Sequence, residues 1–409
     1  MILRQIILAS AGIRRFSSSI IVSAKEPLRF QLLTSDQCSL CFHFKKQFDS
    51  YIKKREFNWT VEEVDIHTDR ALFDVSFPQV EYFGRMIAVH AGAGCHPDGI
   101  DKLCRDVVRS ANGDIVEAIK MFENDPRTNC GFGSNFSLTG KVQCEAAYMT
   151  SKDQRFGAVA AVSTIRNPIV AARQLVVNQI KRRDSTLIAP SILVGEGAEK
   201  YAADSGIDKC SPEDLKSSQA EKIYEKALQK LVISEDRLDT VGAVAIDRDG
   251  TSSAGISSGG IILKFDGRLG HSSQFGGGVW AEQRGGRSVA VTTSGCGEAL
   301  ARTHFAEKLG ESLLEYDTSG GLFIKAVNET FQRGFLENPR VVHSFIPDHR
   351  LAGGVALISD EDDGIAEAII FHNTQHFAFA YSDGTSVKRG LSQLEDGAKF
   401  SAKSYPLRL

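Results

Sequence analysis

The sequence has no apolar run of 18 residues or more, so it offers no helix that could span a membrane. An excess of one charge is also missing, because 48 Lys and Arg stand against 51 Asp and Glu, for a formal net charge of -3. Without a basic excess there is no electrostatic footprint for nucleic acid. We therefore expect neither a membrane partner nor a nucleic-acid partner.

Cysteine is scarce as well: the 8 cysteines in 409 residues are too few for a disulfide scaffold. Only Cys38 and Cys41 form a CxxC pair, and no second pair completes a zinc site, so we predict no metal. Free thiols are typical of a reducing compartment. The sequence therefore predicts an intracellular protein, most simply a cytoplasmic one.

Acidic residues are missing from residues 1–25, which carry several serines and the basic residues Arg4, Arg14, Arg15 and Lys25. This composition is typical of a mitochondrial transit peptide. A leader without structure explains it nearly as well. We interpret residues 1–25 as a leader, with a mitochondrial location as the alternative to the cytoplasm and a nuclear one left open.

Residues 26–84 show the order strand, CxxC, helix, strand and proline. A CxxC at a helix start favours the thiolate, because the helix dipole and free amide hydrogens lower the pKa of the first thiol. The segment resembles part of a glutaredoxin-like, thioredoxin-fold domain, with Cys38 and Cys41 as the redox pair and Pro78 facing them. It ends before the last strand and helix of such a domain, so a vestigial piece or a fusion of two neighbouring genes also fits.

Residues 85–409 form a second region with mixed α/β patterning. An apolar strand at Met86–Val89 opens into a glycine-rich turn, and apolar residues then recur at helical spacing. Asn112-Gly113 is expected to split that helical stretch in two, with Asp114 capping the second helix. The glycine-rich loop that begins at Asp125 either lies on the surface or turns its carbonyls inward, where they can bind a cation.

A hairpin follows a charged linker. The strands "TVGAVAID" and "TSSAGISSGG" flank the turn "DRDG", a strong hairpin signal. A two-residue loop would place Thr240 opposite Ser257, and a three-residue loop would place it opposite Ser258. Either register puts a hydroxyl within side-chain reach of Thr240.

Thr240 stands at the junction of the linker and the first hairpin strand, directly after Asp239. A threonine that becomes N-terminal carries its own base, since an α-amine titrates at about pH 7.7–8.0. An internal threonine lacks that base, so activation would need cleavage of the Asp239–Thr240 bond. On these residues alone, a β-branched residue that merely starts a strand explains Thr240 equally well.

Two further stretches offer groups to a substrate. Residues 292–303 are expected to be a strand end, a glycine turn and a helix start, whose backbone amides can face an anion. Arg268 lies in a glycine-flanked loop, where a guanidinium can hold a carboxylate through two hydrogen bonds. Taken singly, each stretch also fits an ordinary surface turn.

Six motifs in order carry a resemblance to a known family: "VHAGAG", "RTNCGFGSN", "LDTVGAVAID", "SSGG", "GRLG" and "SGCGE". Residues 85–409 resemble the N-terminal-nucleophile (Ntn) hydrolases of the asparaginase family, and within it the threonine aspartase (taspase) branch. The resemblance implies an α/β (α+β) fold, a four-layer αββα sandwich. It also implies self-cleavage into an α subunit ending at Asp239 and a β subunit of residues 240–409, associated as an αβ heterodimer or (αβ)2.

The resemblance also assigns catalytic roles. Thr240 matches the nucleophile, and Ser258 matches the hydroxyl beside the amine of the nucleophile. Ser294 and Gly295 match the pair that stabilises the oxyanion, through a side-chain hydroxyl and a backbone amide.

Substrate-binding roles follow in the same way. Arg268 matches the arginine that grips a substrate carboxylate. Asn135 lies in the loop that braces the site and, in asparaginases, wraps a sodium ion, so a structural sodium at residues 128–140 is implied but no other cofactor. His271 stands where asparaginases have an Asp for the substrate's α-ammonium, which imidazole would not hold well. Glu145 stands where the family usually has Asp.

The loss of that Asp favours an aspartate inside a polypeptide, whose nitrogen is acylated and uncharged. We therefore predict a threonine protease, made as a zymogen, that cuts itself at Asp239–Thr240 and then hydrolyses protein substrates after aspartate. The enzymatic alternative is an isoaspartyl peptidase or L-asparaginase. An alternative of another class is a glutaredoxin-like redox or adaptor protein that acts through Cys38 and Cys41.

Overall fold

The computed structural model describes residues 86–94, 96, 98–181, 186–230 and 240–408, together with the backbone of two strands nearer the N-terminus. The chain divides into two compact units, Met1–Val80 and Glu81–Leu409. In the first, β1 (Arg29–Thr34) pairs in parallel with β2 (Thr60–Asp65). The predicted leader, Cys38, Cys41 and Pro78 lie outside the described residues, so the transit peptide and the redox pair stay predictions.

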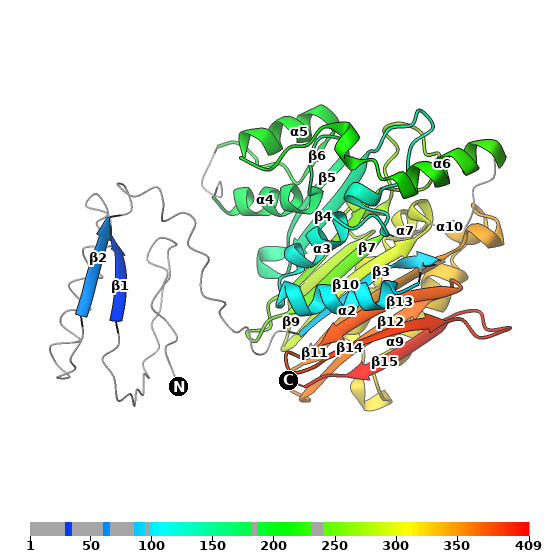
Figure 1. Cartoon of the computed structure of the whole chain (residues 1–409). Helices are drawn as coiled ribbons and strands as arrows, with labels where there is room; N and C mark the ends of the chain where they lie inside the picture. The colour runs from blue at the N-terminus through cyan, green and yellow to red at the C-terminus, as the bar shows by residue number, and fades with distance from the viewer. Residues whose placement is uncertain are drawn as a thin grey trace. The chain divides into compact units, whose positions relative to one another are not determined.

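The described part of the second unit contains two β-sheets that pack face to face, with helices on both outer sides (Figure 1). The larger sheet has the order β14-β13-β3-β7-β8-β4-β5-β6 and the smaller one the order β15-β12-β11-β10-β9. The strands of the larger sheet are β3 (Met86–Gly94), β4 (Cys144–Thr150), β5 (Arg155–Val162), β6 (Ile192–Val194), β7 (Val241–Ile246), β8 (Ser252–Ser258), β13 (His376–Ser382) and β14 (Val387–Gln393). The strands of the smaller sheet are β9 (Val279–Arg284), β10 (Arg287–Gly295), β11 (Ala352–Asp360), β12 (Ile365–His372) and β15 (Ser401–Pro406).

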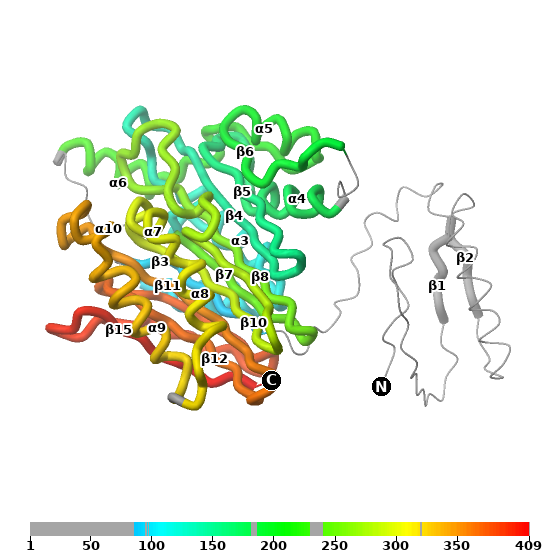
Figure 2. The backbone as a smooth tube through the Cα atoms, turned by 180° about the vertical axis from the view of Figure 1, so that it is seen from behind, coloured from blue at the N-terminus to red at the C-terminus, as the bar shows by residue number. Residues whose placement is uncertain are grey.

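Helices complete the outer layers. Helices α2, α3 and α4 pack on the larger sheet, and α8 and α9 pack on the smaller one, as Figure 2 shows from behind. The helices are α2 (Ile100–Ala111), α3 (Ile115–Glu123), α4 (Pro168–Lys181), α5 (Gly195–Asp204), α6 (Ser218–Lys230), α7 (Gly297–Thr303), α8 (Phe305–Glu315), α9 (Ile324–Phe331) and α10 (Pro339–Val342). This is the αββα sandwich that the sequence predicted.

The central strands are buried on both faces, which explains their small apolar residues. In β7, Val241 and Ala243 pack under the helices of the larger sheet, whereas Val244 and Ile246 pack between the two sheets. Side chains alternate between the faces of a strand, so both faces must be apolar and thin. At Gly242 any Cβ would collide with His90 of the neighbouring strand β3 and with Thr292 of the facing sheet.

The helical stretch after β3 is divided where the sequence predicted. Asn112 and Gly113 adopt left-handed conformations, with φ of 47° and 84°. Such residues end a helix readily. The Asp114 side chain then accepts hydrogen bonds from the backbone amides of Val116 and Glu117, so it caps α3 as expected.

The hairpin adopts the register of the three-residue loop. Val241 pairs with Ser257 across β7 and β8, so Thr240, one residue earlier, faces Ser258. The turn closes at Gly250, whose φ of 76° favours glycine. Of the two serines that the sequence allowed as cross-strand partners of Thr240, the structure therefore selects Ser258.

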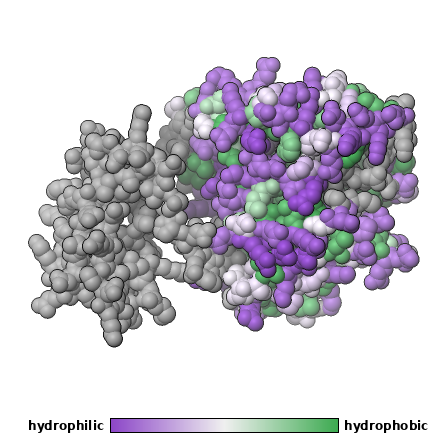
Figure 3. Space-filling view, viewed as in Figure 1, coloured by the Kyte–Doolittle hydropathy of each residue, from purple (hydrophilic) through white to green (hydrophobic). Residues whose placement is uncertain are grey.

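One face of the second unit is mostly hydrophilic. Figure 3 shows hydrophilic side chains over most of the described face, with apolar ones gathered near its middle. Within the described residues, no helix combines the length and the apolar character needed to cross a membrane.

Candidate active site

Strand pairing brings two hydroxyls together at the start of β7. Thr240 is 4% exposed, and its Oγ1 lies 3.0 Å from the Oγ of Ser258. Either hydroxyl can donate in this pair. The backbone N–H of Gly260 donates to Ser258 Oγ at 3.0 Å. That amide holds the Ser258 hydroxyl in place, so Thr240 faces a positioned partner.

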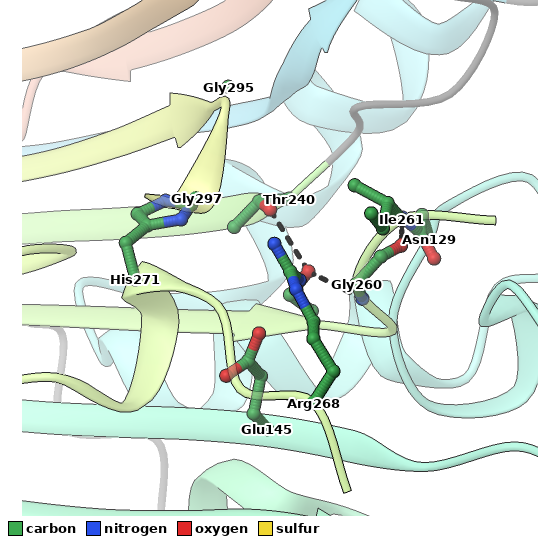
Figure 4. A pocket seen from close by; sticks show the side chains of 10 residues that line it. Asn129, Glu145, Thr240, Gly260, Ile261, Arg268, His271, Gly295 and Gly297 are labelled. Carbon is green, nitrogen blue, oxygen red and sulfur yellow. Dashed lines mark hydrogen bonds between the residues drawn. The ribbon is translucent and has the colours of Figure 1, made fainter. Parts of the chain in front are cut away.

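Thr240 lies in the wall of a small pocket. Five predicted site residues line it: Thr240, Ser258, Arg268, His271 and Gly295. Figure 4 shows the Arg268 guanidinium and the Thr240 hydroxyl pointing into the same space. Among the described residues, five to which the sequence analysis assigned no role also line it: Asn129, Glu145, Gly260, Ile261 and Gly297.

Arg268 is held in a fixed orientation. Its Nε and Nη2 donate to the two carboxylate oxygens of Glu298 at 2.8 and 2.7 Å. Burial acts to raise the pKa of Glu298, but the hydrogen bonds and the positive charge of Arg268 together outweigh it, and that pKa lies below its ordinary value. A Cβ on Gly297 would lie 2.8 Å from Nη2, and one on Gly260 would lie 3.3 Å from Nη1. These glycines leave the guanidinium room to face the pocket.

His271 is buried and neutral. Its Nε2 lies 3.1 Å from the carbonyl oxygen of Thr293, which can only accept, so Nε2 carries a proton. Burial lowers the pKa of His271 to about 4, and the charge of Arg268 acts in the same direction. At neutral pH this position therefore supplies no charge of either sign to the pocket.

The predicted oxyanion pair lies at the end of β10. Gly295 lines the pocket with a φ of 140°, and a Cβ there would collide with the Leu351 carbonyl. Ser294 is fully buried behind it, and its Oγ accepts a hydrogen bond from the Ala93 amide at 3.0 Å. Ala93 belongs to the glycine-rich end of β3, so that turn supports the oxyanion residues.

Asn135 braces the site from behind its lining. The Nδ2 groups of Asn135 and Asn129 both donate to the carbonyl of Gly260, each at 2.9 Å. The backbone amide of Asn135 donates to Asn129 Oδ1 at 2.8 Å. The two side chains thus fix the turn whose amide holds Ser258. Only Asn129 of the two lines the pocket.

A sodium ion in the same loop stays a prediction. A Cβ on Gly133 would lie 3.0 Å from the carbonyl oxygens of Asp125 and Pro126, and closer still to that of Thr128. Converging carbonyl oxygens are the donors that hard cations prefer, so the residues present fit such an ion. When bound, it would stiffen the loop that carries Asn129 and Asn135.

Comparison with known proteins identifies the family. A family model described as Asparaginase matches residues 99–334, more than half of the chain. The chain belongs to the asparaginase family. The match includes Thr240, Ser258 and Arg268, so this hydrolase carries its hydroxyl pair and its pocket arginine within the family region.

Curated relatives carry more specific names. Isoaspartyl peptidase/L-asparaginase of Rattus norvegicus is 35% identical over 252 residues, which cover 58% of this chain and 72% of the relative. Isoaspartyl peptidase of Escherichia coli is 32% identical over 258 residues, covering 60% and 72%. The Homo sapiens isoaspartyl peptidase/L-asparaginase is 33% identical over 242 residues, covering 54% and 74%. These names support the alternative of the sequence analysis better than its taspase interpretation.

Buried histidines should make this hydrolase sensitive to acid. Burial lowers the pKa of His90 to about 3, and those of His271 and His372 to about 4, from an ordinary 6.5. Below pH 6.5 these histidines bind protons in the unfolded chain but stay neutral in the folded one. The free energy of unfolding therefore falls as the pH drops toward 4. Each histidine contributes up to about 1.4 kcal/mol per pH unit. Urea unfolding at pH 7.5, 6.0 and 5.0 would measure the loss.

Glu123 contributes with the opposite sign. Burial raises the pKa of its carboxyl to about 8, so its share of stability rises as the pH falls from 8 toward 4.5. Glu123 offsets roughly the stability that one histidine loses in acid. Glu123→Gln should therefore make the free energy of unfolding fall more steeply as the pH drops. His372→Gln should make the loss shallower. A free energy of unfolding that stays constant from pH 7.5 to 5.0 would contradict this account.

Proposed function

We propose that this hydrolase cleaves itself between Asp239 and Thr240 and then hydrolyses aspartyl amide bonds as an isoaspartyl peptidase or L-asparaginase. One observation carries the proposal: the Thr240 hydroxyl lies 3.0 Å from Ser258 in a pocket that Arg268 also lines. The names of the relatives support the substrate class.

In the self-cleavage step, the Thr240 oxygen attacks the carbonyl carbon of Asp239. The carbon–nitrogen bond breaks as the ester forms, and the nitrogen leaves as the Thr240 amine with the hydroxyl proton. Water then hydrolyses the ester, which frees the Asp239 carboxyl and the Thr240 hydroxyl. Asp239 lies outside the described residues, so the proposal rests on Thr240 and Ser258.

In turnover, the freed amine takes the proton of the Thr240 hydroxyl, and the oxygen attacks the amide carbon of the substrate. The oxyanion forms next to Gly295, where the backbone amide and the Ser294 hydroxyl stabilise it. The amine of the substrate leaves with the transferred proton, and water hydrolyses the ester. Arg268 binds a carboxylate of the substrate and orients it.

The two chains should stay together after cleavage. The α subunit contributes β3 and β4, and the β subunit contributes β7 and β8 between them. Both new chains therefore share continuous ladders in one sheet, β3 with β7 and β4 with β8. We infer an αβ heterodimer as the minimal mature unit.

A second candidate function is hydrolysis of protein substrates after aspartate. The buried, neutral His271 favours it, because position 271 offers no negative charge to a free α-ammonium. An aspartate inside a polypeptide has no such ammonium, and its side-chain carboxylate would meet Arg268.

A substrate panel separates the two candidates. The cleaved protein is given L-asparagine, a β-aspartyl dipeptide, and a peptide with blocked ends and one internal Asp-Gly bond. The primary proposal expects product from the first two at a kcat/KM at least about 100-fold above that for the peptide. If only the peptide is cleaved, the primary proposal is wrong and the second candidate function holds. Activity on none of them, or equal activity in Thr240→Ala, would overturn both.

A further inference from the structure

Glu145 is a buried carboxylate at the wall of the pocket. It is 2% exposed, and it lies in β4 directly opposite Ser258 of β8. On its other side, the pairing of β4 with β5 shifts register between Cys144 and Ala146, so the extra residue of a bulge lies on β5, opposite Glu145. Side chains alternate along β4, so Glu145 shares the face between the two sheets with Ala147 and Met149, and it lines the pocket there.

The carboxylate of Glu145 is bonded to the loop that carries Arg268. The Gly270 amide donates to both carboxylate oxygens, at 3.1 and 3.0 Å, and the Ser273 hydroxyl donates to Oε2 at 2.9 Å. These bonds join the pocket wall to both sides of His271. Glu145 therefore fixes the loop at two points, two and five residues after Arg268.

Close packing makes this connection tight. A Cβ on Gly270 would lie 2.6 Å from Oε1 of Glu145 and 3.0 Å from Nη1 of Arg268. Gly270 thus lies close to both the carboxylate and the guanidinium, with no room for a side chain. Figure 4 shows Glu145 and Arg268 approaching each other beside Thr240. A shift of Glu145 that displaces the Gly270 backbone would therefore change the packing against the guanidinium.

We propose that Glu145 is a positioning residue, which sets where the Arg268 guanidinium meets a carboxylate of the substrate. Ser258, which lies opposite Glu145 on the neighbouring strand, positions the Thr240 hydroxyl through a hydrogen bond. One strand pair then couples the position of the nucleophile to that of the specificity arginine. This inference deepens the proposed function and rests on it for the identity of the substrate.

Glu145→Gln tests the proposal, because it removes the charge and keeps the shape. We expect KM for the preferred substrate to rise about 10- to 100-fold, with kcat within about threefold and self-cleavage complete. Glu145→Asp keeps the charge, so its KM should rise less than that of Glu145→Gln. A lost kcat with unchanged KM would overturn the proposal, since a merely structural role acts that way.

A matched control is available in the smaller sheet. Glu367 is also 2% exposed, and its Oε2 accepts a hydrogen bond from the Ser404 hydroxyl at 2.6 Å. Glu367→Gln removes a buried carboxylate of the same kind on a strand outside the pocket lining. It should leave KM unchanged. An equal rise in KM in both variants would overturn the positioning role.

Direct binding keeps the test independent of turnover. Calorimetric titration of the cleaved protein with L-aspartate, and separately with N-acetyl-L-aspartate, measures carboxylate binding alone. If Glu145→Gln weakens binding 10- to 100-fold while the wild type hydrolyses nothing, the proposed function fails and the positioning role stands. Unchanged binding in Glu145→Gln overturns the positioning role. If the wild type binds neither probe, Arg268 is no carboxylate receptor and both fail.

Discussion

Replacing Thr240 by alanine should leave one uncut polypeptide and lower turnover by at least about 10⁴-fold, the scale on which enzymes lose activity with their nucleophile. The wild type should instead give two fragments, ending at Asp239 and beginning at Thr240. The reason is that one hydroxyl serves both reactions, and its base exists only after the first. Intact mass spectrometry and a kinetic assay of the same preparation would measure both effects.

Two further variants control this experiment. Thr240→Ser keeps a hydroxyl and, once cut, an α-amine, so it should self-cleave and retain measurable activity. Ser258→Ala removes the partner that lies 3.0 Å from Thr240 Oγ1, and should slow self-cleavage about 10- to 100-fold without abolishing it. An uncut chain that still hydrolyses its substrate would be incompatible with the mechanism.

Replacing Arg268 by alanine should lower kcat/KM by about 10²- to 10³-fold, mostly through KM, because the variant loses a charge-assisted contact in a water-poor site. Its side chain is 13% exposed, so solvent screens the contact little. Glu298 would also lose both of its hydrogen bonds from the guanidinium. Steady-state kinetics on the cleaved protein would measure the loss.

Arg268→Lys isolates the geometry from the charge. An ammonium cannot make the paired contact of the guanidinium with Glu298, so most of the loss should remain. Arg287 is the control, since it pairs with Asp360 at 2.6 Å on strands β10 and β11. Arg287→Ala should affect stability and leave KM unchanged. If KM does not rise in Arg268→Ala, Arg268 does not bind the carboxylate of the substrate.

Parts of the fold with local signals were accessible from the sequence. The break between α2 and α3 follows from Asn112-Gly113 and the Asp114 cap, which act within a few residues of chain. The β7–β8 hairpin follows from its turn residues in the same way. Its register was open between two choices, because loop length depends on how the closing residues bend.

The pocket was only partly accessible. Arg268 and Gly295 received roles through glycine-rich motifs, whereas Asn129, inside the motif "RTNCGFGSN", and Glu145, noted only as a departure from the family's Asp, received none. Asn129 acts through the carbonyl of Gly260, 131 residues away, and no periodicity encodes such a pair. Glu145 acts through hydrogen bonds from Gly270 and Ser273, more than 120 residues away, which no local pattern encodes either. The taspase interpretation relied on motifs and on His271, and the relatives' names favour the isoaspartyl alternative.

By itself, the sequence determined that a threonine follows a charged linker and begins a strand whose hairpin partner carries hydroxyls. Those are properties of neighbouring residues, and short-range geometry is enough to express them. Tertiary structure alone decided that Glu298 orients Arg268 and that His271 is neutral. Each of these depends on strand order and burial, because distances and pKa values in a core are set by groups far apart along the chain.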